Sequence, residues 1–161
     1  MAIEHHLDLD TSLPGEAIRS LLLWTGRYVD GGDWHDIRHV LSGSTVVSIR
    51  GKAPGETGFG AMFGCRATCS LTFRSRRAPG GGWTFELSTV AASVALLSAV
   101  HGDALLTLNP DLPGLLRRGG RTVISPDLGS RGHPWSVELP ARLAAAGIAA
   151  ETAPILPVAR T

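Results

Sequence analysis

A pair of histidines is the most specific candidate for chemistry in this sequence. His35 and His39 are four residues apart in a segment whose pattern predicts a short helix beginning at Asp33. Side chains at i and i+4 of a helix lie on one side and can bind one metal ion. A third ligand would have to come from His101 or His133, and the glutamate of the metalloprotease His-Glu-x-x-His motif is absent. The alternative is a pair of solvated surface histidines.

The two cysteines are the next candidates. Cys65 and Cys69 fall on the apolar face of a strand predicted over residues 65–73. Burial disfavours the thiolate, so neither is expected to be a nucleophile. On one strand their Cα atoms would be roughly 13 Å apart, too far for a disulfide. Two buried free thiols fit a reducing compartment, and we expect a cytoplasmic protein.

Other catalytic patterns are incomplete. The serines at 42, 44 and 125 lack the Gly-x-Ser-x-Gly context of a hydrolase nucleophile. The glycine run 80–82 lacks the lysine and hydroxyl of a phosphate-binding P-loop, so it predicts a turn. From these patterns we assign no catalytic residue, no cofactor and no metal ligand, and we expect a protein that is not an enzyme.

Arginines and tryptophans are candidates for contact with a partner. Arginine pairs bidentately with carboxylates, and tryptophan is enriched at binding hot spots. If the strands that carry the arginines are neighbours, they form a basic patch that suits an acidic partner. The expected partner-binding residues are Arg74, Arg76, Arg77, Arg117, Arg118, Trp34 and Trp83. A solvated sheet face is the alternative for the arginines, and partly buried core positions for the tryptophans.

Composition restricts the class of protein. The 161 residues are enough for one domain, and we expect a single globular domain over 1–161. Hydrophobic residues make up 43% of the chain, which is typical of a packed core. With 15 basic and 14 acidic side chains the net charge is +1, so nucleic acid is not an expected partner. No apolar run approaches the ~20 residues of a membrane span, and the N-terminus lacks a secretory signal.

Strands and helices alternate along the chain without a regular β-α-β rhythm. Period-two patterns predict strands at 3–9, 44–50, 65–73 and 103–109, a turn at 51–58, and a hairpin turn at Gly119-Gly120. Helical spacing predicts helices at 14–28, from Asp33 to before Gly43, through 87–97, and from Pro140 onward. These elements predict an α+β fold, a largely antiparallel sheet with helices packed on one face.

Two stretches resemble the Sit-type immunity family of bacterial contact-dependent polymorphic toxin systems. One is Met-Ala-Ile-Glu-His-His-Leu-Asp-Leu at residues 1–9. The other combines Gly-Asp-Ala-Leu-Leu-Thr-Leu-Asn at 102–109 with Leu-Leu-Arg-Arg-Gly-Gly-Arg at 115–121, and the segment 68–76 is similar to the family's central strand. The resemblance covers about half the chain. It implies a non-enzymatic inhibitor that binds a cognate protein toxin.

The sequence therefore gives one leading hypothesis and two alternatives. The leading hypothesis is an immunity-type protein that neutralises a toxin by direct binding, with variable loops that select the toxin. The first alternative is a metal-dependent enzyme that uses His35 and His39. The second is an oligomerisation module, whose signature would be a stable homo-oligomer.

Overall fold

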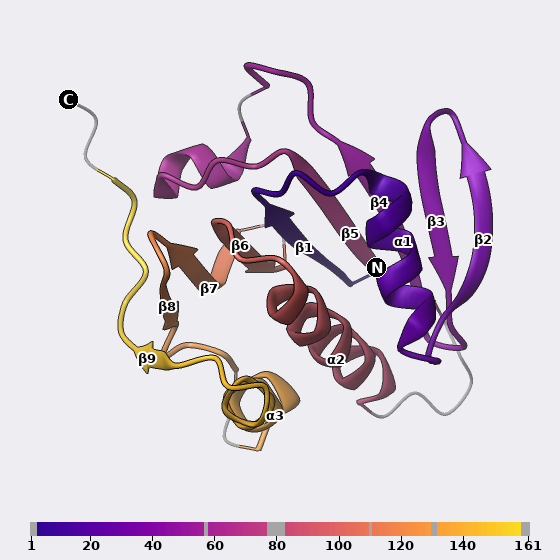
Figure 1. The fold of residues 1–161 in the computed structure, drawn as a ribbon. Helices are drawn as coiled ribbons and strands as arrows, with labels where there is room; N and C mark the ends of the chain where they lie inside the picture. Colours follow the sequence, from indigo (N-terminus) through magenta and orange to yellow (C-terminus); the bar gives the residue numbers. More distant parts are fainter. Residues whose placement is uncertain (1–2, 57, 77–82, 110, 130–131, 159–161) are drawn as a thin grey trace.

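The computed structural model describes residues 3–56, 58–76, 83–109, 111–129 and 132–158. These residues form an α+β fold: one nine-stranded, mostly antiparallel sheet with three α-helices on one face (Figure 1). The predicted fold class is confirmed.

The strands follow one another across the sheet in the order β2-β3-β4-β5-β1-β6-β7-β8-β9. Every neighbouring pair is antiparallel except β8 and β9, which are parallel. Their bounds are β1 (Glu4–Leu9), β2 (Val29–Trp34), β3 (Ile37–Leu41), β4 (Thr45–Gly51), β5 (Cys69–Ser75), β6 (Ala104–Leu108), β7 (Leu112–Arg118), β8 (Arg121–Ile124) and β9 (Ala150–Thr152).

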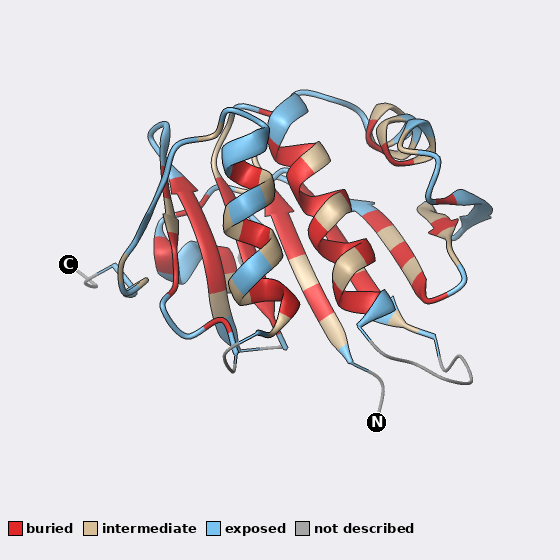
Figure 2. Ribbon diagram, turned by 90° about the horizontal axis from the view of Figure 1, so that it is seen from below, coloured by how far each residue is buried: buried red, intermediate tan, exposed pale blue. Residues whose placement is uncertain are grey.

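The main core lies between the sheet and the helices α1 (Gly15–Trp24), α2 (Thr84–Ala99) and α3 (Pro134–Ala145). Buried and less buried positions alternate along β4 and β5 because successive side chains point to opposite faces (Figure 2). Helix α2 lies between α1 and α3, and most of its positions are buried, including polar ones such as Thr89 and Ser93. The apolar positions whose helical spacing predicted this helix are therefore only one part of its buried surface.

On the opposite face of the sheet, a second layer covers β6 and β7. There the 3-10 helix η1 (Phe59–Phe63) and the C-terminal segment form a small second core around Leu105 and Leu116. Cys65 belongs to this second core, whereas Cys69 belongs to the main one. Over β4, β5 and β1 this face carries polar side chains.

Several predicted elements are confirmed. The strands at 3–9, 44–50 and 103–109 are β1, β4 and β6, and the turn Gly119-Gly120 joins β7 to β8 with positive φ at both glycines. The helix through 87–97 is α2.

Four boundaries or types were predicted wrongly. The helix expected at 14–28 ends at Trp24, and the strand expected from Cys65 begins at Cys69 because η1 and a left-handed residue, Gly64, precede it. Helix α3 starts six residues before Pro140, because Pro134 occupies its first position and His133 Nδ1 accepts from the Trp135 amide. The helix expected from Asp33 is a β-hairpin.

Candidate protein-binding surface

The β2–β3 hairpin forms one edge of the sheet, and its turn explains why the helix prediction failed. His35 and Asp36 both have positive φ, 48° and 61°, which closes a two-residue turn of the kind that joins antiparallel strands. A bulge between Asp30 and Gly32 adjusts the register, and a Cβ on Gly31 would lie 3.0 Å from the His39 side chain. The hairpin therefore requires its glycines, and β2 is a fully exposed edge strand.

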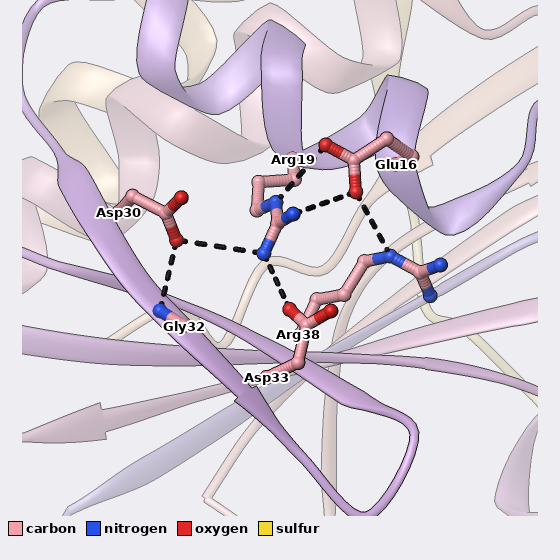
Figure 3. A network of polar contacts seen from close by, with 6 residues as sticks. All are labelled: Glu16, Arg19, Asp30, Gly32, Asp33 and Arg38. Carbon is pink, nitrogen blue, oxygen red and sulfur yellow. Dashed lines mark hydrogen bonds and ion pairs between the residues drawn. The ribbon is translucent and has the colours of Figure 1, made fainter.

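An ion-pair network fixes this hairpin to α1 (Figure 3). The Arg19 guanidinium on α1 pairs with Glu16 at 2.7 Å and with Asp30 and Asp33 on β2. Arg38 on β3 donates to Glu16 at 3.2 Å. Hydrogen bonding to Glu16 and the surrounding carboxylates raise the pKa of Arg19. Arg19 thereby holds the exposed edge strand β2 against α1, and Arg38 links β3 to the same helix.

The carboxylates of this network are more exposed to solvent than the Arg19 guanidinium that they surround. The Arg19 side chain is 13% exposed, whereas those of Glu16, Asp30 and Asp33 are 55–57% exposed. Carboxylate oxygens that face outward can accept hydrogen bonds from a cationic partner.

Large apolar side chains lie on the same elements. Trp24 at the end of α1 is 88% exposed, Trp34 at the end of β2 is 69% exposed, and Val29 is 64% exposed. We call the exposed side chains of α1 and β2 the edge surface, defined by Glu16, Trp24, Val29, Asp30, Asp33 and Trp34. On β2, Val29 and Trp34 point to the face opposite the one that carries Asp30 and Asp33. The tryptophans of the edge surface are of the residue type enriched at binding hot spots, and its carboxylates can select a partner by charge.

The predicted histidine pair is not supported by this geometry. His35 is in the hairpin turn, where its ring contacts Trp34, and His39 is on β3 opposite Ser48. The i, i+4 argument fails because the segment is not helical. Within the described ranges, no group of three or more His, Cys, Asp or Glu side chains is placed to hold a metal ion.

One of the predicted partner-binding arginines is an internal residue, which contradicts its assignment. Arg117 is 6% exposed, and its guanidinium donates to the carbonyls of Gly102, Leu97 and Val100 at the C-terminal end of α2. Desolvation lowers its pKa. Arg117 therefore stabilises the helix terminus and cannot contact a partner.

The other predicted arginines do not form one patch. Arg74 on β5 pairs with Glu4, and Arg76 donates to the Ser42 carbonyl. Arg118 donates to the Phe63 carbonyl from β7, near the opposite end of β1. Arg77 lies outside the described residues.

The two predicted tryptophans are also far apart. Trp83 precedes α2, is 51% exposed and contacts His133. Phe85, two residues after Trp83, stacks on His5 of β1, so Trp83 lies near β1. Three strands separate β1 from β2, the edge strand that carries Trp34. Only Trp34 belongs to the edge surface, and Trp24 is a member that the sequence prediction missed.

A buried ion pair lies on the face of the sheet opposite the three α-helices. Lys52 Nζ is 3.2 Å from Asp8 Oδ1, with both side chains no more than 10% exposed. Lys52 lines two adjoining hollows of 600 and 360 Å³ beneath the loop that leads to η1. The nearby thiols are not activated, because burial raises the pKa of Cys65 to about 12 and that of Cys69 to about 11. The pair holds this loop against β1.

His6 comes closest to a hydrolase arrangement on that face. Its Nδ1 lies 3.2 Å from the Thr72 hydroxyl, and its Nε2 lies 3.9 Å from Glu4. A triad needs the carboxylate in hydrogen-bond contact with one ring nitrogen to fix the tautomer. At 3.9 Å Glu4 does not make that contact.

Comparisons with protein-family models, with curated proteins and with solved structures find no match for this chain. The edge surface therefore rests on its geometry alone.

The helices described here, between residues 15 and 145, include none with the length and apolar character to cross a membrane.

Proposed function

We propose that this chain is an immunity-type protein that neutralises a cognate bacterial toxin by binding it through the edge surface. The observation that carries the proposal is the exposure of Trp24 and Trp34 on elements held in place by the Arg19 network. A binding strand that is already held in place loses little backbone conformational entropy when a partner binds. The resemblance of residues 1–9, 102–109 and 115–121 to the Sit-type immunity family supports an immunity function.

The charge of the edge surface favours a basic partner surface rather than the acidic one expected from the arginines. Three half-exposed carboxylates outnumber the two arginines of the network, Arg19 and Arg38, whose side chains are 13% and 33% exposed, so the network has one negative charge in excess. Complementary charge raises the association rate and selects the partner. The two free buried thiols support a cytoplasmic site of action.

Rescue of growth tests the proposal. Proteins captured from the source cell with this chain as bait are expressed one by one, alone and together with the chain. The proposal expects one captured protein that stops growth when expressed alone and does not when co-expressed. If no captured protein is toxic, or if the chain fails to rescue growth, the immunity function is wrong.

Size-exclusion chromatography of the purified chain tests the oligomerisation alternative. A stable homo-oligomer that Trp34→Ala dissociates would assign the edge surface to self-association. The immunity proposal expects a monomer whose elution volume Trp34→Ala leaves unchanged.

A further inference from the structure

A second recessed site lies far from the edge surface, between the start of β1, the first turn of α2 and the start of α3. Its volume is 150 Å³. Liquid water occupies about 30 Å³ per molecule, so the cavity has room for a small organic group. Its polar lining comes from His5, Glu86, Asn109, His133 and Trp135, and the rest of the wall is mainly apolar.

The protonation of His5 follows from its contacts. The ring is 4% exposed, stacked on Phe85 and edge-on to Trp135. Its Nδ1 accepts the backbone N–H of Asn109 at 3.1 Å, where Asn109 has a left-handed φ of 52°. Burial lowers the His5 pKa to about 4, so the ring is neutral at pH 7. A neutral imidazole that accepts at Nδ1 carries its proton on Nε2.

Two residues that line the cavity each carry a buried N–H donor with no acceptor among the described residues. The donors are His5 Nε2 and Trp135 Nε1. Glu86, buried in the same wall, has no ion-pair or hydrogen-bond partner for its carboxylate among those residues. Unsatisfied buried donors cost about 1–3 kcal/mol each, so a complementary occupant would stabilise the site.

The donor pattern decides the chemistry of the occupant. A metal ion is excluded at His5 because Nε2 carries the proton, and metals bind the unprotonated nitrogen. A carboxylate would satisfy His5 but meet the negative charge of Glu86, and an ammonium group would satisfy Glu86 but not His5. A neutral amide offers one acceptor and two donors in a planar group.

We propose that this cavity binds a small molecule that carries a primary carboxamide. Its carbonyl oxygen accepts from His5 Nε2–H, and its amide nitrogen donates to Glu86. The Trp135 indole N–H is a second donor to the same carbonyl oxygen, and the apolar wall contacts the rest of the molecule. The site is independent of the proposed toxin-binding function.

Nuclear magnetic resonance of the ¹⁵N-labelled full chain tests this site with acetamide as the probe. The His5 Nε2–H and Trp135 Nε1–H resonances are expected to shift saturably with acetamide. Acetate and methylammonium at the same concentrations are expected to give no saturable shift. If the shifts with acetamide do not saturate, the cavity holds only water and the proposal is wrong. An equal response to acetate would also overturn it.

Two histidine variants provide the matched comparison. His5→Phe keeps a ring packed against Phe85 and Trp135 but removes the donor, so acetamide binding read at the Trp135 indole should weaken about tenfold. His6→Phe changes the next residue, which points to the opposite face of the sheet, and should leave the affinity unchanged. If His5→Phe binds acetamide as the wild type does, or if both variants weaken it equally, the assignment to His5 is wrong.

Discussion

Arg117 and Arg19 each bond to three acceptor groups, but in opposite surroundings. In the interior, at the end of α2, Arg117 is buried and donates to three neutral carbonyls of the chain. At the edge surface, Arg19 pairs with three carboxylates whose outer sides face solvent. The first arrangement completes a helix terminus and leaves nothing for a partner. The second fixes an exposed strand and leaves acceptors and tryptophans exposed beside it.

The interior arginine should carry the largest effect on folding. Arg117→Met removes a charged donor from three carbonyls and leaves them buried without their donor. We expect the free energy of unfolding in urea to fall by on the order of 3–5 kcal/mol. Arg118→Met, at the next and exposed position, should change it by less than about 1 kcal/mol. Equal effects at the two positions would contradict the distinction between interior and surface.

The buried His5 should make the interior sensitive to acid. Its folded pKa, about 4, lies below the unfolded value of 6.5, so the unfolded chain binds the proton first as the pH falls. The contribution of neutral His5 to the free energy of unfolding is fully present above pH 6.5 and is lost as the pH falls to about 4. The loss amounts to roughly 3 kcal/mol.

The difference between wild type and His5→Phe isolates this contribution. His6 and His133, which also influence His5, are the same in both proteins. Urea unfolding at a series of pH values should show the variant losing less stability than the wild type between pH 6.5 and 4. Parallel curves over that range would mean that His5 is not held neutral by burial.

At the edge surface the expected effects on folding are local. Arg19→Met releases Asp30 and Asp33 from α1, so backbone amides of β2 and β3 should exchange hydrogen faster while those of β5 and β6 do not change. Raised salt should speed exchange in the wild-type hairpin because it screens exposed ion pairs. Hydrogen exchange followed by mass spectrometry measures both. Faster exchange throughout the sheet would show that the network supports the whole fold.

The smallest effect on stability is expected at Trp34. Its ring is largely exposed, so Trp34→Ala should change the free energy of unfolding by no more than about 0.5 kcal/mol. A loss of several kcal/mol in thermal or urea unfolding would assign Trp34 to the fold rather than to binding.

The alternating strands could be predicted from sequence because each has one apolar and one polar face. In β1, Leu7 and Leu9 lie on the face covered by the α-helices, and His6 and Asp8 lie on the opposite face. The β2–β3 hairpin was missed because β2 is exposed throughout and carries no apolar face, and His35-Asp36 is not a common turn pair. The histidine spacing then matched a helix that does not form.

The candidate site was only partly predictable, because it depends on which strands become neighbours. Trp34 was identified from its residue type, but Arg19 reaches Asp30 and Asp33 only after the hairpin has folded back on α1. Arg117 and Arg118 look alike in sequence, and strand parity sends one into the interior and the other to the surface. No spacing rule in the sequence distinguishes these outcomes.

Calorimetric titration of the captured toxin into the wild type, Trp34→Ala and Trp83→Ala tests the central claim most directly. Both variants remove one exposed tryptophan, and only Trp34 lies on the edge surface. We predict that Trp34→Ala weakens binding by about 30-fold or more, as truncation of a hot-spot tryptophan does, while Trp83→Ala changes it less than about threefold. An unchanged affinity for Trp34→Ala, or a larger loss for Trp83→Ala, would contradict the assignment of the edge surface as the toxin-binding site.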